Sequence, residues 1–204
     1  MPSARRTPAE RRANCGSARW GSIVTPRLVL REFTMADIEA YYELESNEEN
    51  ARYQDWLPRT MDQARELVLA NIQGSSACPR STWELVVECA GRMIGRVGAA
   101  STQLEHDSSN RTTNHVDLWF SFLPAFHGKG YATEAMEVFI EVLSQGQDAD
   151  VMELEIECDP RNTGSWKLAQ RLGFERHSLT RRAWESKGEW VDSLVYRKVM
   201  EGGI

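Results

Sequence analysis

The chain has 204 residues, of which 41% are hydrophobic and 26% charged, the usage of a soluble globular protein with room for one hydrophobic core. Its formal net charge of −6 argues against general nucleic-acid binding, and no stretch approaches the roughly 18 apolar residues of a membrane span. Cys15, Cys78, Cys89 and Cys158 show neither C-x-x-C nor zinc spacing, so we expect no metal site and interpret them as reduced thiols of a cytoplasmic protein.

The N-terminal segment differs in charge from the rest of the chain. Residues 1–20 hold five arginines and one glutamate, a charge of +4, which leaves −10 for residues 21–204. The segment lacks the apolar region of a secretory signal; its arginines suit an organelle transit peptide, but Pro2, Pro8 and Gly16 interrupt any amphipathic helix. We predict a disordered basic tail over 1–23 and one domain over 24–204. The acidic domain suits a cationic partner such as an amine, or serves solubility alone.

The first half of the domain combines helix-start signals with apolar strands. The predicted elements, in chain order, are a strand over 27–33, helices from Thr34 and Thr60, and strands over 83–89 and 93–100 that flank a turn. Asp37 and Gln63 stand three residues after the two threonines, the spacing of a capping box. Residues 101–114 are polar, and we predict a loop there.

The second half alternates strands with helices. The predicted elements are a strand over 115–123, a helix over 132–143, a strand over 151–158, a helix that ends at Gly173, and two strands around Lys187-Gly188. Residues 116–122 and 151–158 both show a period of two. The resulting order, β-α-α-β-β-β-α-β-α-β-β, predicts an α+β domain around one sheet.

The junction between the strand ending near Leu123 and the next helix carries the clearest chemical signal. Two glycines, Gly128 and Gly130, precede a helix that has no Ser, Thr, Asp or Asn to cap its first N–H groups. Free N–H groups at a positive helix end, with Lys129 beside them, suit a phosphate or diphosphate. The competing interpretation is a tight turn that binds nothing.

Three segments in this order resemble the GNAT acetyltransferase superfamily, in its RimJ/RimL-like branch of ribosomal-protein N-acetyltransferases. They read Thr-Pro-Arg-Leu-Val-Leu-Arg at 25–31, His-Gly-Lys-Gly-Tyr-Ala-Thr-Glu-Ala at 127–135, and Asn-Thr-Gly-Ser at 162–165 leading to Leu-Gly-Phe at 172–174. The resemblance covers residues 24–200. It implies a mixed, mostly antiparallel sheet with flanking helices, in which two central parallel strands, 116–122 and 151–158, splay apart around the pantetheine arm of acetyl-CoA.

The resemblance also implies which residues hold the cofactor. The family's diphosphate loop, Arg/Gln-x-x-Gly-x-Gly/Ala, matches at His127, Gly130 and Ala132, with histidine in place of the usual Arg or Gln. The departure matters little if backbone N–H groups do the binding. The expected cofactor-binding residues are Phe120, Phe122, His127, Gly128, Lys129, Gly130, Tyr131, Ala132, Thr133, Asn162 and Ser165.

The implied reaction is attack by a neutral primary amine on a thioester within a ternary complex, which requires a base. Asp117 matches an acidic position of the family and is the first candidate; Glu155 and Glu157 are rivals on the neighbouring strand. Ser165 matches a serine of the branch and is the candidate for protonating the thiolate. Ala169 occupies the position where many members have a tyrosine that acts as the general acid. Each of these residues has a purely structural alternative.

Two other functions compete with the N-acetyltransferase. The missing tyrosine leaves open a non-catalytic acyl-CoA-binding module, which turnover of an amine would exclude. A nucleotide-binding Rossmann domain is disfavoured, because Thr133 replaces the third glycine of G-x-G-x-x-G and the loop lies in mid-chain. The acceptor, a peptide N-terminus or a small-molecule amine, and the oligomeric state, monomer or homodimer, stay open.

Overall fold

Two threonines open helical segments, Thr34 a 3-10 turn that leads into an α-helix and Thr60 an α-helix, as their capping-box spacing predicts. The Thr60 hydroxyl accepts from the Gln63 backbone N–H, and the Gln63 side chain accepts from the Thr60 N–H at 2.9 Å. The Asp37 carboxylate accepts from the Thr34 N–H at 2.7 Å. Each helix therefore has a fixed first turn, from which its apolar side faces the sheet.

The computed structural model describes residues 20–106, 111–145 and 149–201. The elements, in chain order, are β1 (Ile23–Val24), β2 (Val29–Arg31), the 3-10 helix η1 (Met35–Asp37), α2 (Ile38–Glu45), α3 (Glu48–Ala51), α4 (Met61–Gly74), β3 (Thr82–Cys89), β4 (Arg92–His106), β5 (Thr112–Phe122), the 3-10 helix η2 (Pro124–Phe126), α5 (Tyr131–Gln145), β6 (Val151–Cys158), α6 (Thr163–Arg171), β7 (Glu175–Ser186) and β8 (Glu189–Glu201).

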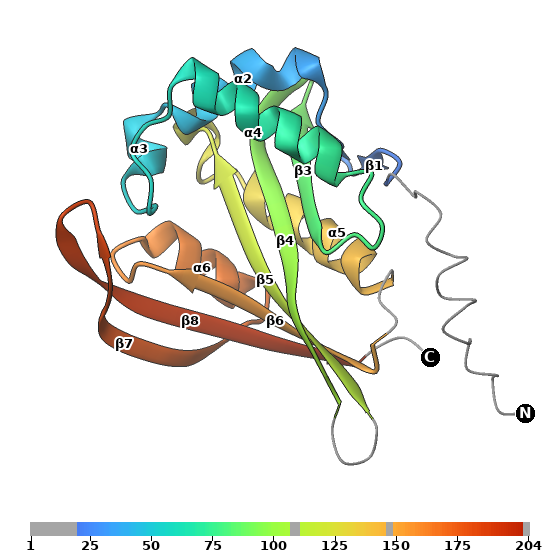
Figure 1. Cartoon of the computed structure of the whole chain (residues 1–204), viewed down its shortest axis with the longest axis vertical. Coiled ribbons are helices and arrows are strands. Elements are labelled where there is room, and N and C mark those ends of the chain that lie inside the picture. The colour runs from blue at the N-terminus through green and yellow to red at the C-terminus, as the bar shows by residue number, and fades with distance from the viewer. Residues whose placement is uncertain (1–19, 107–110, 146–148, 202–204) are drawn as a thin grey trace, which may run out of the picture.

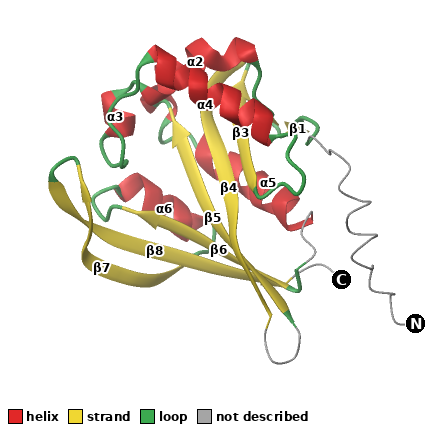
Figure 2. Ribbon diagram, viewed as in Figure 1, coloured by secondary structure: helices red, strands yellow, loops and turns green. Residues whose placement is uncertain are grey.

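The described strands form one sheet in the order β1-β2-β3-β4-β5-β6-β8-β7 (Figure 2). All neighbouring strands are antiparallel except β5 and β6, which are parallel. Helices α2 and α4 cover one face near the upper end in Figure 1, and α5 and α6 lie on the other. The predicted α+β fold with one parallel pair in a mostly antiparallel sheet is confirmed.

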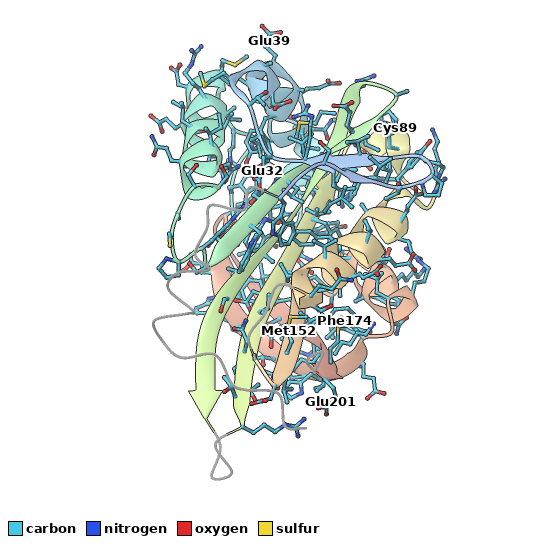
Figure 3. The ribbon with its side chains drawn as sticks, turned by 90° about the vertical axis from the view of Figure 1, so that its right-hand side faces the viewer. Glu32, Glu39, Cys89, Met152, Phe174 and Glu201 are labelled. Carbon is cyan, nitrogen blue, oxygen red and sulfur yellow. The ribbon has the colours of Figure 1, made fainter. Side chains whose placement is uncertain are left out.

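Two apolar clusters fasten the helices to the two faces. The larger includes Phe139 of α5 and Leu168 of α6 against the strands, with Met152 and Phe174 among the side chains in Figure 3. The smaller joins Tyr41 of α2 and other residues of α2 and α4 to the opposite face. Because both faces are covered, the central strands are buried, and the ends of β5 and β6 have a fixed position relative to α5 and α6.

Two predictions at this level need correction, and one helix was missed. Residues 101–106 and 112–114 are not a loop, because β4 and β5 extend into a long hairpin; β-branched residues such as Thr112 and Thr113 favour strands even where the composition is polar. Helix α3 was not predicted. Cys89 and Cys158 are free thiols, whereas Cys78 is disulfide-bonded, so the prediction of four reduced cysteines is wrong there.

The N-terminal tail lies mostly outside the described residues, as does Cys15. Trp20 and Ile23, which the predicted boundary leaves in the tail, pack against the larger cluster. The Trp20 ring lies 6.1 Å from that of Trp83 and 5.7 Å from that of Phe139. None of the described helices is both long and apolar enough to cross a membrane.

Candidate functional site

A cleft opens where the two parallel strands part. The β5–β6 ladder ends at the pair Asp117–Glu155. Beyond it, β5 stays paired with β4 as far as Phe122, and β6 stays paired with β8 as far as Cys158. The two strands therefore diverge in a V, and backbone groups of β5 that point toward β6 lose their ladder partner.

The cleft has a volume of about 1040 Å³, large enough for an extended cofactor. Its walls combine the diverging end of β5, the first turns of α5 and α6, and the segment around α3. Its lining includes Phe120, Ser121, Phe122, His127, Gly128, Gly130, Tyr131, Ala132, Thr133, Asn162 and Ser165. Nearly all of the predicted cofactor residues thus lie together, although they come from three separate segments.

The mouth of α5 presents unused backbone donors to this cleft. Gly128 and Gly130 have φ values of +71° and +80°, a conformation that disfavours any side chain. In the part of the chain that the structure describes, no group accepts a hydrogen bond from the N–H groups of residues 128–133. An uncapped, partly positive helix end of this kind is a ready binding site for an anion.

Two side chains of the loop, those of His127 and Lys129, donate hydrogen bonds to backbone carbonyls of the protein itself. The Nε2–H of His127 donates to the Phe122 carbonyl at 2.8 Å and so joins the loop to the end of β5. The Lys129 ammonium donates to the Ala125 carbonyl at 2.8 Å and lies over the Phe126 ring, and Lys129 is absent from the cleft lining. The structure therefore separates Lys129 from the other predicted cofactor residues.

A brace of charged groups, which the sequence did not reveal, holds the loop from the N-terminal side. Arg27 donates from Nε to Glu134 at 2.6 Å and from Nη1 to the Lys129 carbonyl at 2.8 Å. Its backbone N–H and the Thr25 hydroxyl also donate to the Glu134 carboxylate. Burial is the largest single influence on the pKa of Glu134 and raises it. The hydrogen bonds from Thr25 and Arg27 together outweigh burial, so the pKa is lowered. The Thr-Pro-Arg-Leu motif thus fixes the first turn of α5.

The guanidinium of Arg27 also borders the cleft. It lies 4.6 Å from the centre of the Tyr131 ring, and its Nη2 would lie 3.3 Å from a Cβ added to Gly130. Arg161 and Arg171 line the same cleft. The only earlier signal for Arg27 was its place in a segment that carries the family resemblance.

The opposite wall is the N-terminus of α6. The Asn162 side chain caps this helix by accepting from the Ser165 N–H at 3.2 Å. Ser165 is 8% exposed and faces the cleft. Burial raises the pKa of the neighbouring Cys158 thiol to about 11, although a hydrogen bond with Ser165 opposes this. The thiol therefore stays protonated at neutral pH beside the serine.

Asp117 lies at the point of the V, on the sheet face opposite the α5 and α6 core. Partial burial raises its pKa, and the charges of Glu155 and Glu157 raise it further, while His115 and Arg197 oppose them. Asp117 lines neither the cleft nor the cavity beside it. Its position beside two other carboxylates therefore favours the protonated form of Asp117.

The rival carboxylates have structural partners. Arg197 binds Glu155 at 2.7 Å and Glu153 at the same distance. The Ser193 hydroxyl donates to Glu157. Both rival carboxylates are therefore already engaged by side chains of the protein itself.

A second cavity of about 290 Å³ lies beside the cleft and shares Gln54 and Phe120 with it. Its other lining residues are Tyr41, Trp56, Arg59, Leu67, Asn71, Glu84, Arg96 and Trp119. These come from α2, α4, β3, β4, β5 and the segment after α3. Within residues 20–106, 111–145 and 149–201, no cluster of three or more His, Cys, Asp or Glu side chains is arranged to hold a metal ion.

Comparison with known proteins agrees with this geometry. The family model described as "Acetyltransferase (GNAT) domain" matches residues 27–175. An uncharacterized N-acetyltransferase of Bacillus subtilis strain 168, YnaD, is 24% identical over 174 residues, which are 85% of this chain and 94% of YnaD.

Solved structures share the fold. A GNAT-family acetyltransferase from Bacillus anthracis superimposes with a TM-score of 0.73 at 21% identity, covering 89% of this chain and 99% of that one. The ribosomal L7/L12 α-N-protein acetyltransferase RimL, in complex with coenzyme A, gives a TM-score of 0.71 at 18% identity, with coverage of 89% and 98%.

Proposed function

The chain belongs to the GNAT acetyltransferase family, and we propose that it transfers the acetyl group of acetyl-CoA to a primary amine. One observation carries the proposal: unused N–H groups at the mouth of α5 face a cleft that runs between two diverging parallel strands. Backbone donors suit a diphosphate, and the gap between the strands suits the narrow pantetheine arm that follows it.

In this proposal the cofactor binds mainly through backbone groups. The N–H groups of residues 128–133 hold the diphosphate, and Phe120 and Phe122 contact the pantetheine arm. Asn162 uses its Oδ1 to cap α6, which leaves its amide N–H groups for a carbonyl of the arm. RimL was solved with coenzyme A, which supports the same ligand for this chain.

The reaction itself forms one bond and breaks another. The nitrogen of a neutral amine attacks the thioester carbonyl, the C–N bond forms, and the C–S bond breaks with release of CoA. Asp117, directly or through water, takes the proton that the nitrogen loses. A β5 N–H freed by the splay stabilises the oxyanion, and Ser165 donates a hydrogen bond to the leaving thiolate.

The acceptor enters, in this proposal, from the face that carries Asp117. The relative RimL is an α-N-acetyltransferase of a ribosomal protein, which supports a peptide N-terminus as one acceptor class, beside small-molecule amines. An acidic domain attracts either kind of cationic acceptor.

A non-catalytic acyl-CoA-binding module is the second candidate. Ala169, where many family members have a tyrosine, is fully buried beside Leu168, so α6 offers no phenol to the cleft. Such a module would bind acetyl-CoA without consuming it.

Ligand-dependent melting and turnover test both functions together. At 100 times its dissociation constant, a ligand adds about 2.7 kcal/mol of stability. We expect acetyl-CoA and CoA to raise the melting temperature, NAD to leave it unchanged, and a panel of amines to release CoA from acetyl-CoA. Stabilisation without release of CoA would favour the binding module, and no stabilisation by either CoA species would refute both functions.

A further inference from the structure

The cavity beside the cleft has aromatic walls and a floor of paired charges. Arg96 donates from Nε to Glu45 at 2.9 Å and from Nη1 to Glu84 at 2.5 Å. The second oxygen of Glu84 accepts from the indole N–H of Trp119 at 2.9 Å. Arg96 and Glu45 are 7% and 2% exposed, so this network is a fixed part of the core rather than a flexible surface pair.

The Trp119 ring lies flat against the sheet because the strand beneath it has a glycine. A Cβ added to Gly98 would lie 2.2 Å from the indole Cε2 and Nε1, a distance that no side chain tolerates. The hydrogen bond to Glu84 then fixes the ring. The wall that Trp119 forms is therefore set by the backbone of β4, not by the packing of a mobile side chain.

Glu84, which lines the cavity, and Glu45, which shares Arg96 with it, already have cationic partners. Glu84 has Arg96 and Trp119 as partners, and Glu45 has Arg96 and Arg59. A second positive charge on an acceptor would meet two arginines there, with no carboxylate left unpaired. The formal charges of Arg59, Arg96, Glu45 and Glu84 cancel, so the cavity has no excess negative charge that would attract a second cation.

Arg59 is the most available of these donors. Its Nε lies 3.4 Å from Glu45, its backbone N–H donates to the Glu45 carbonyl, and its guanidinium lies 4.9 Å from the centre of the Trp56 ring. Among the residues that the structure describes, no group accepts from its Nη1 or Nη2. Its side chain is 24% exposed and lines the cavity, so an anchored guanidinium offers its two terminal nitrogens to whatever enters.

We propose that this cavity is an acceptor subsite that selects amines carrying an anionic group, a carboxylate or a phosphate, which Arg59 binds. The inference rests on the proposed function, because the cavity adjoins the cleft through Phe120 and Gln54. A guanidinium fork matches both anions. The volume of about 290 Å³ suits a group the size of one amino-acid side chain, between the aromatic walls.

Paired acceptors that differ only in charge test the proposal. One pair is alanyl-glutamate amide and alanyl-glutamine amide; the other is O-phosphoethanolamine and ethanolamine. We expect the wild-type enzyme to favour at least one anionic member by about tenfold in kcat/KM, the effect of a charge-assisted contact. The pair that shows the preference identifies the carboxylate or the phosphate as the source of the anion.

Variants assign the preference to one residue. Arg59→Gln should bring the ratio close to one, Arg59→Lys should retain part of it, and Arg65→Gln should leave it unchanged, since Arg65 is an exposed arginine of the adjacent α4. Melting curves check that each variant folds. If the glutamine variant unfolds, the lysine variant tests the guanidinium fork, and an undiminished preference in it would count against binding by Arg59.

Two outcomes separate this inference from the proposed function. A wild-type enzyme that acetylates both members of both pairs equally well, or a preference that survives in Arg59→Gln, would overturn the anionic subsite and leave the acetyltransferase standing. Absence of turnover with any amine, despite binding of acetyl-CoA, would overturn the catalytic function and the subsite with it.

Discussion

The cleft proposed for the cofactor and the cavity beside it adjoin at Phe120 and Gln54, yet they present different groups to a ligand. At the mouth of α5 the cleft presents backbone N–H groups, held in place by glycines with positive φ and by the Arg27–Glu134 brace. The cavity presents side chains from six separate segments, with its charges paired across the sheet. A ligand common to a whole family suits the first construction, and a ligand particular to one chain suits the second.

Gly130→Glu should abolish binding of CoA. The glutamate would need a left-handed φ, would approach Arg27 Nη2, and would place a negative charge at the proposed diphosphate site. We expect CoA affinity to fall by more than about 100-fold in calorimetry. Gly91→Glu is the matched control, because Gly91 has φ +78° and lies in the β3–β4 turn with open space around it. Equal loss in both variants would point to backbone strain alone.

Asp117→Asn should lower the catalytic rate without changing the affinity for CoA. Removing a general base costs about 10²- to 10⁴-fold in rate, so kcat should fall by about that factor while CoA affinity stays within twofold. Full activity would remove Asp117 as the base and favour Glu155 or Glu157.

The pH dependence of the wild-type rate gives an independent check. A base works only when deprotonated, so kcat/KM for the amine should fall as the pH drops through the pKa of Asp117, which burial and the two glutamates raise. In Asp117→Asn this acid limb should disappear, while the rise toward the amine pKa of about 8 to 10 stays. An unchanged acid limb would assign it to another group.

Arg27→Gln should weaken the grip on the diphosphate without touching the chemistry. The variant loses the charge beside Tyr131 and the contacts that hold the loop, so we expect the KM for acetyl-CoA to rise by about tenfold with kcat nearly unchanged. S-acetylpantetheine, which lacks the diphosphate, is the control donor, and its kcat/KM should be the same in both proteins. A similar loss with both donors would mean that the variant disturbs the cleft as a whole.

Gly98→Ala should weaken binding of the amine without changing binding of acetyl-CoA. The added methyl group displaces the Trp119 ring and breaks its hydrogen bond to Glu84, so the KM for the amine should rise by about threefold to tenfold while that for acetyl-CoA holds. Gly74→Ala, at a glycine with open space around it, should change neither constant. A rise in the KM for acetyl-CoA instead would show that Trp119 supports the cleft.

The contrast between the two sites also explains what the sequence could and could not predict. Gly128, Gly130 and the absence of a capping residue are local signals, and they predicted both the positive φ values and the unused donors. The Arg27–Glu134 brace joins residues 107 positions apart, and no local pattern announces it. The cavity depends likewise on contacts between distant segments, such as Arg96 with Glu45.

Local rules also failed where tertiary pairing decides the outcome. Lys129 has the right charge beside the proposed anion site, but its ammonium donates to the Ala125 carbonyl and lies over the Phe126 ring. The polar residues 101–114 suggested a loop, but residues 101–106 pair with residues 112–116 as the ends of two long strands. Composition and spacing predict what a segment prefers, and neighbours in space determine what it does.

Amide chemical shifts during a CoA titration report directly on the proposed diphosphate site. In ¹⁵N-labelled protein, we expect the N–H resonances of Gly128, Gly130, Tyr131 and Ala132 to shift more with CoA than with pantetheine, and more than those of Gly91 or Gly188 with either ligand. Binding of CoA that leaves these four resonances unchanged would show that the diphosphate binds elsewhere and that the N–H groups at the start of α5 do not hold it.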